Sequence, residues 1–112
     1  MASLTLKQNY RRPQINSILT DANGDVVDLT AASGVKFIMN STTASTSKVD
    51  AAASITTATD GTVNYTWAAG DTDTIGAYNA EFEVDWGSDI YETFPGSDYI
   101  SITIIADLGG DI

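Results

Sequence analysis

The sequence predicts an all-β fold, an antiparallel β-sandwich of seven to eight short strands. Segments that alternate apolar and polar residues recur about every ten residues along the chain, a spacing typical of sandwiches. Turn-forming pairs separate these segments, among them Asn23-Gly24, Asp60-Gly61 and Pro95-Gly96. A length of 112 residues suits one domain with a single hydrophobic core.

The strand with the clearest pattern covers residues 78–86. Every second residue is apolar and every intervening residue is polar, which predicts one face in a core and the other in water. Residues 62–67 alternate in the same way, and so does the region around Phe37. Together these patterns predict a core that contains Phe37, Tyr65, Trp67, Tyr78, Phe82, Val84 and Trp86.

The other elements follow from weaker patterns. The alternation around Phe37 predicts a strand at residues 35–39, and three more strands are predicted at residues 15–19, 90–94 and 100–104. Apolar character also resumes at residues 26–29, after the turn at Asn23-Gly24. Residues 49–55 fit a strand by parity, although their alanine content also suits a helix. The small, uncharged residues 41–47 predict a mobile loop at the rim of the domain.

The chain divides into one domain with two short terminal segments. We expect the sandwich at residues 13–107 and a C-terminal tail at residues 108–112. Residues 1–12 precede Pro13, which cannot donate a hydrogen bond within a central strand. Two interpretations of residues 1–12 stay open: an ordinary first strand of the same sheet, or an arm that reaches a neighbouring subunit.

Composition narrows the function classes. The chain has no cysteine and no histidine. A small secreted sandwich usually carries a disulfide, so synthesis in a reducing cytoplasm is expected. Without His the commonest general base and the commonest transition-metal ligand are missing, so we expect no enzymatic activity and no cofactor, although catalysis by paired carboxylates needs neither His nor Cys. Neither a membrane-spanning run nor a signal peptide is predicted.

The arrangement of charge is more informative than the formal net charge of −10. The basic residues Lys7, Arg11 and Arg12 precede every acid, whereas no Lys or Arg follows Lys48. Such an acidic body repels nucleic acid and anionic membranes, so neither is an expected partner. Two interpretations stay open: acidity that keeps the protein soluble, or charge complementarity between neighbouring subunits.

The polar face of the clearest strand gives the candidate contact residues. Glu81, Glu83 and Asp85 form an acidic row there. A solvated surface is one interpretation. The other is a docking stripe for a basic neighbour, and the segment that carries Lys7, Arg11 and Arg12 offers the matching charge.

Other possible sites have simpler interpretations. The segment Asp21–Asp28 holds three carboxylates and an amide, which suggests calcium, but its spacing differs from an EF-hand and Asn-Gly already forms a turn. We therefore predict the turn and no metal ion. Asp71 and Asp73 fall in a connecting loop rather than across a cleft, so they are predicted to bond to nearby backbone. Tyr91 and Tyr99 are expected to be exposed, where a sugar ring is a candidate ligand.

The stretch before the clearest strand resembles the corner of immunoglobulin-like sandwiches. In that corner a Tyr follows Asp and Gly, two residues before the Cys of a late strand. Here the Tyr is Tyr78 and the Cys position holds Ala80, so the resemblance is to an immunoglobulin-like fold without its disulfide. It implies that the Tyr78 hydroxyl bonds to backbone around Asp71 to Asp73.

A longer series of motifs resembles one particular family. In order, they are Ile15–Asp21, Val27–Thr30, Val35–Met39, Gly61–Trp67, Gly70–Thr72, Gly76–Tyr78, Glu81–Val84 and Thr93–Pro95. This series is similar to the immunoglobulin-like domain at the N-terminus of phage baseplate upper proteins and in small phage tail and head proteins. The resemblance covers about residues 6 to 107.

The resemblance implies a non-enzymatic structural protein of a bacteriophage virion, present in many copies among other phage structural proteins. Its expected place is the tail, baseplate or fibre region, where it acts as an adaptor or attachment module. Two alternatives stay open: a decoration protein on the surface of the capsid head, and a carbohydrate-binding module for host adsorption.

Overall fold

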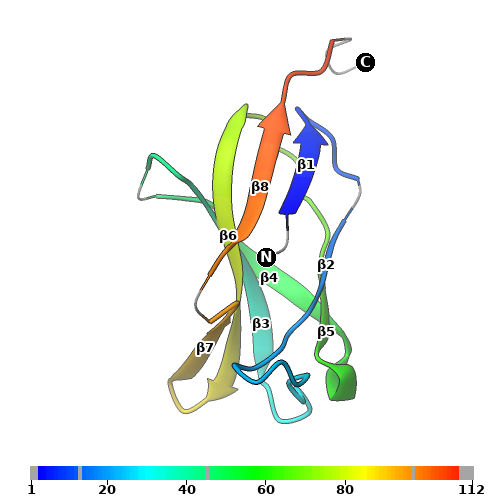
Figure 1. Cartoon of the computed structure of the whole chain (residues 1–112), viewed down its shortest axis with the longest axis vertical. Coiled ribbons are helices and arrows are strands. Elements are labelled where there is room, and N and C mark those ends of the chain that lie inside the picture. The colour runs from blue at the N-terminus through cyan, green and yellow to red at the C-terminus, as the bar shows by residue number, and fades with distance from the viewer. Residues whose placement is uncertain (1–2, 13, 45, 97, 109–112) are drawn as a thin grey trace.

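The computed structural model describes residues 3–12, 14–44, 46–96 and 98–108. Within them the fold is all-β, as predicted, with one short 3-10 turn at Ala58–Asp60 (Figure 1). The strands are β1 (Ser3–Lys7), β2 (Ile15–Ile18), β3 (Gly34–Ser41), β4 (Ser47–Thr57), β5 (Thr62–Tyr65), β6 (Gly76–Gly87), β7 (Ile90–Phe94) and β8 (Ile100–Ile105). In the part of the chain that is described, no helix is long and apolar enough to cross a membrane.

The strands form one curled sheet in the order β1-β8-β6-β3-β4-β5-β2, and β7 pairs with the second half of β6. Neighbours run antiparallel except β1 and β8, which are parallel. The long strand β4 explains the curl, because its first part pairs with β3 and its last residues pair with β5. The sheet therefore folds back on itself, and the inner sides of its two halves share one core.

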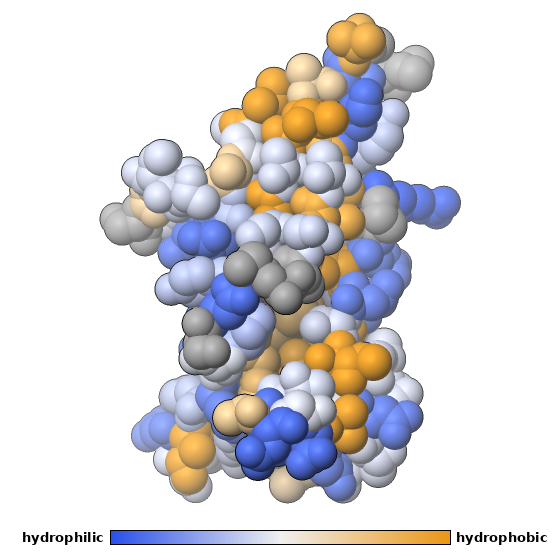
Figure 2. All heavy atoms as spheres, viewed as in Figure 1, coloured by the Kyte–Doolittle hydropathy of each residue, from blue (hydrophilic) through white to orange (hydrophobic). Residues whose placement is uncertain are grey.

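Apolar side chains also reach the surface at one end of the molecule. Figure 2 shows them where β8 leads toward the C-terminal residues. Ile75, Ile105 and Leu108 are among the exposed large hydrophobic residues. The rest of the visible face is mixed, with small polar side chains over β8 and β1.

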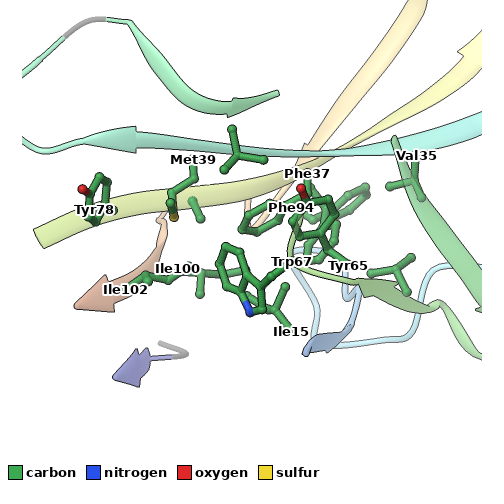
Figure 3. Close-up of a cluster of buried hydrophobic side chains, with 14 of the residues drawn as sticks. Ile15, Val35, Phe37, Met39, Tyr65, Trp67, Tyr78, Phe94, Ile100 and Ile102 are labelled. Atoms are coloured by element: carbon green, nitrogen blue, oxygen red, sulfur yellow. The ribbon is translucent and has the colours of Figure 1, made fainter. Parts of the chain in front are cut away.

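The core is centred on three aromatic rings that come from both halves of the curled sheet (Figure 3). Phe37 on β3 stacks on Tyr65 of β5 with ring centroids 4.7 Å apart. Trp67 meets both rings edge-on at 5.6 Å. Such stacked and edge-to-face pairs stabilise a core beyond the area that they bury. This cluster joins the two halves of the sheet without any disulfide.

Six of the residues predicted for the core are buried: Phe37, Tyr65, Trp67, Tyr78, Phe82 and Val84. Trp86 is a correction, because it is only partly buried and packs against the edge of the core. It lies at the end of β6, where its indole Nε1 donates to Glu92 Oε1 at 3.1 Å. Trp67 itself lies beyond the end of β5, so its burial does not depend on strand pairing.

The first described residues belong to the same sheet. Ser3–Lys7 pairs with Ser101–Ile105 of β8, and the Leu6 side chain is buried. Residues 3–7 therefore form a first strand of the same sheet, as one of the two interpretations of residues 1–12 has it, whereas residues 8–12 belong to no strand, and an intersubunit role for them stays a prediction. Met1 and Ala2 lie outside the described residues, as does Pro13.

Several local predictions also change. Residues 49–55 lie within β4, so the strand interpretation holds and the helix does not. The polar loop is shorter than predicted, because Ser41 ends β3 and Ser47 begins β4. Residues 26–29 form no strand; a single bridge joins Val26 to Thr20, and Leu29 is nevertheless buried.

Candidate interaction surface

The acidic row lies on the outer side of the sheet, as its alternation with core residues predicts. Along β6, Glu81, Glu83 and Asp85 are half-buried, whereas the residues between them point into the core. In the neighbouring strand β3, Ile38 lies opposite Glu81 and Lys36 lies opposite Glu83. The row therefore runs beside one basic residue of the same chain.

That basic residue has its own partner, so the row keeps most of its negative charge. Lys36 Nζ forms an ion pair with Asp50 Oδ1 at 2.6 Å, and this bond raises the Lys36 pKa. Burial raises the pKa of Glu81, and the negative charge of Glu83 adds to the effect. Glu81 thus lies in surroundings that disfavour its charge.

A pocket of about 320 Å³ opens beside Glu81 on this outer side. Its lining comes from β3, β6, the β3–β4 connection and the residue before β8: Ile38, Asn40, Ser41, Thr42, Ala44, Asn79, Glu81 and Tyr99. The β3–β4 connection projects from the sheet at the left of Figure 1. In the β6–β8 register Ile100 pairs with Ala80. Extending this register by one residue places Tyr99 next to Glu81.

One of the residues that line this pocket has a polar atom without a partner among the described residues. The Asn40 side-chain oxygen Oδ1 is buried and accepts no hydrogen bond from the described residues. A buried acceptor without a donor costs about 1–3 kcal/mol, so such atoms are rare in folded proteins. Tyr99 is 50% exposed and lines the same pocket. The pocket therefore has unused hydrogen-bond acceptors and an available aromatic ring.

The basic cluster lies away from the acidic row in the same molecule. Arg11 and Arg12 are exposed, in the connection between β1 and β2, while Lys7 is half-buried at the end of β1. The Arg11 Nε donates to the Trp67 carbonyl oxygen at 3.1 Å, which fixes this connection on the domain. Among the described residues, ion pairs join Lys36 to Asp50 and Lys48 to Asp73, and Arg12 takes part in neither.

The other candidate residues act within their own loops. Asp21 Oδ1 accepts from the backbone amides of Asn23 and Asp25, at 2.9 and 3.1 Å, which is the geometry of a turn. Over the described ranges no group of three metal-ligating side chains comes together. Asp71 accepts from the Tyr65 hydroxyl and the Ala68 amide, and Asp73 pairs with Lys48. Tyr91 is exposed, like Tyr99, but lies on β7.

A second hollow lies at the open edge of the sheet. It has a volume of about 840 Å³ and runs between β2 with its following turn and the β7–β8 connection. In the strand order β2 and β1 each have a neighbour on one side only, so the sheet has two terminal edges. Such edges present unpaired backbone groups to other chains.

Sequence patterns did not identify the pocket. The outward positions of Asn40 and Asn79 follow from strand alternation, and the two residues lie opposite each other in the β3–β6 register. Their meeting with Tyr99 depends on the order of β3, β6 and β8, which no local pattern contains. No family model matches the sequence, and no curated protein matches it either.

Proposed function

We propose that this protein is a non-enzymatic structural component of a bacteriophage virion, with an immunoglobulin-like β-sandwich fold. Its place is the tail, baseplate or fibre region, where it serves as an adaptor or attachment module present in many copies. It is made in the host cytoplasm and joins other phage structural proteins.

The strand order supports the immunoglobulin-like part of this proposal. In a constant-type domain three strands of one sheet are the third, sixth and seventh, and the other sheet contains the second, fifth and fourth. Here β3, β6 and β8 are neighbours in one half, and β2, β5 and the end of β4 are neighbours in the other. If β7 is counted as an added hairpin strand, these six strands have the neighbours that the constant-type order gives them, whereas β1 differs because it pairs with β8 rather than with β2.

One observation carries the functional part: the motifs that resemble the phage family come together in the core. Tyr65 and Trp67 of the Gly-x-Val-x-Tyr-x-Trp motif pack around Phe37, and Tyr78 of the corner is buried nearby. Residues from several of the motifs that carry the resemblance therefore pack in the same core. The motif side chains stabilise the core rather than form a reactive site, which suits a protein with a structural role in an assembly.

The surface features of the protein support a role in assembly rather than in a reaction on a dissolved substrate. The acidic row, the pocket at Glu81 and the open sheet edges are features through which neighbouring chains bind. A place on the capsid head would use the same surfaces, so it remains the alternative location. Adsorption to a host glycan is the other alternative, and a glycan array tests it directly.

The test is to locate the protein in intact particles. Purified virions are analysed by protein mass spectrometry and by cryo-EM reconstruction. The expected result is many copies per particle, with density for this fold in the tail, baseplate or fibre. Density on the head lattice would favour the decoration role, and absence from purified particles would overturn the proposal.

A further inference from the structure

The pocket beside Glu81 is built to receive hydrogen-bond donors. Its unpartnered buried atom, Asn40 Oδ1, is an acceptor, and the carboxylate of Glu81 provides further acceptor oxygens. Ile38 adds an apolar side and Tyr99 an exposed ring. A planar group with several N–H donors satisfies all of these features, because it can bond at its edge and stack on an aromatic face.

Electrostatics favours a cation over a neutral ligand. Glu81 is held in surroundings that disfavour its charge, with Glu83 on the same strand adding to the repulsion. A neutral sugar would remove water from this carboxylate without compensating its charge. A guanidinium group compensates the charge and supplies donors to the amide oxygen at once, in the paired geometry that arginine gives with carboxylates.

The chain itself carries a suitable cation. Arg12 is exposed, and the described ion pairs do not include it. It belongs to the β1–β2 connection, which lies at the margin of the molecule opposite to the β3–β4 connection (Figure 1). Figure 2 shows hydrophilic side chains projecting from that same margin. A head-to-tail contact joins two different surfaces of the subunit, and donor and acceptor surfaces on opposite margins allow it.

We propose that Arg12 of one copy inserts into the pocket formed by Asn40, Glu81 and Tyr99 of a second copy. The guanidinium donates to Glu81 and to Asn40 Oδ1 and stacks on the Tyr99 ring. Because the contact joins two different surfaces, repetition gives a closed ring or an extended row of subunits. The inference rests on the assembly role proposed above and names the partner of this surface as the same chain.

Sedimentation velocity of the purified full chain tests the contact, at rising protein concentration and low ionic strength. We expect concentration-dependent association of the wild type that weakens with added salt. Arg12→Glu and Glu81→Lys should each weaken association by about tenfold or more, since each leaves a charge unpaired. The double variant, which exchanges the two charges, should recover association in part, because the ion pair is restored while Asn40 Oδ1 still lacks a donor.

Asp60→Lys is the matched control for Glu81→Lys. It makes the same change of net charge at an exposed position in the 3-10 turn, outside the pocket, so association should stay as in the wild type. Circular dichroism confirms that each variant is folded before its association is compared. A folded wild type that stays monomeric at every concentration overturns the proposal, and so does undiminished association of Arg12→Glu.

Two results separate this inference from the virion role. A protein found in particles but monomeric in solution, with saturation binding of a neutral saccharide at Asn40 and Tyr99, overturns the inference and leaves the virion role intact. A protein that associates through Arg12 but is absent from purified particles overturns the virion role alone.

Discussion

The hydroxyl of Tyr78 donates a hydrogen bond to the carbonyl oxygen of Thr74, 2.7 Å away. The acceptor lies one residue beyond the Asp71–Asp73 segment that the sequence resemblance implied. The bond closes the corner that leads into β6, and the Tyr78 ring is buried with the core. The same side chain thus anchors both the loop and the longest strand.

Tyr78→Phe should therefore destabilise the protein by about 1–3 kcal/mol, because the Thr74 carbonyl loses its donor while the ring still fits. The denaturant midpoint measures the change. Tyr91→Phe is the matched control, since Tyr91 is exposed and should give the wild-type midpoint. Equal midpoints for the two variants would show that the corner bond contributes nothing to stability.

The two tryptophans should differ in their surroundings. Trp67 is fully buried, whereas Trp86 is only partly buried. Trp86→Phe leaves Trp67 as the reporter, which should emit at short wavelength and resist iodide. Trp67→Phe leaves Trp86, which should emit at longer wavelength and be quenched. Free quenching of Trp67 in the folded protein would contradict the core described here.

Truncating each tryptophan to alanine should show the same difference between the two sites as a difference in the free energy of unfolding. Trp67→Ala is expected to cost about 3–5 kcal/mol, as large-to-small changes in a packed core do. Trp86→Ala should cost less, because part of its ring already contacts water. The free energies of unfolding of both variants, from denaturant titrations, provide the comparison, and a larger cost for Trp86 would be the opposite of the expected order.

Gly61 should tolerate no side chain. Its φ of +66° lies in the left-handed region, and a Cβ there would lie 2.6 Å from the Val27 carbonyl oxygen and 2.9 Å from that of Leu19. Gly61→Ala must move backbone and should cost clearly more than the ~1–2 kcal/mol of left-handed strain alone. Gly24→Ala is the control, with φ +84° and open space around its Cβ. Thermal melting compares the two, and equal losses would argue against the close contact.

Stability should fall at alkaline pH through Tyr65. Burial raises the Tyr65 pKa, and its hydrogen bond to the negatively charged Asp71 raises it further. The folded chain thus keeps this proton to higher pH than the unfolded chain does. The contribution is complete below the unfolded pKa of about 10 and declines as pH rises above it. Tyr65→Phe should flatten the fall in unfolding free energy between neutral and alkaline pH, and an unchanged slope would contradict this.

How far the sequence predicts the structure depends on which feature is considered. The period-2 alternation of β6 identified its buried side from Tyr78 to Val84, because a pleated strand turns every second residue the same way. Alternation does not show where a strand leaves the core, and that is why Trp86 was placed too deep. Leu29 shows the reverse, a buried residue in a segment that forms no strand.

The candidate site was predictable only in part. The acidic row follows from one strand, so Glu81 and Glu83 could be placed on the outer side from sequence alone. The pocket could not, because Asn40 on β3 and Tyr99, the residue before β8, meet only through the strand order. The unpartnered oxygen of Asn40 is a property of packing, which the alternation of residue types does not encode.

The parallel pairing of β1 with β8 has a mechanical consequence. The two strands point the same way, so tension that pulls Ser3 and Ile105 in opposite directions acts along the strands rather than across them. The hydrogen bonds between them then bear the force together and must break together, whereas an antiparallel end pair would peel open one bond at a time. Tension applied between these two ends is therefore resisted by all the β1–β8 hydrogen bonds at once.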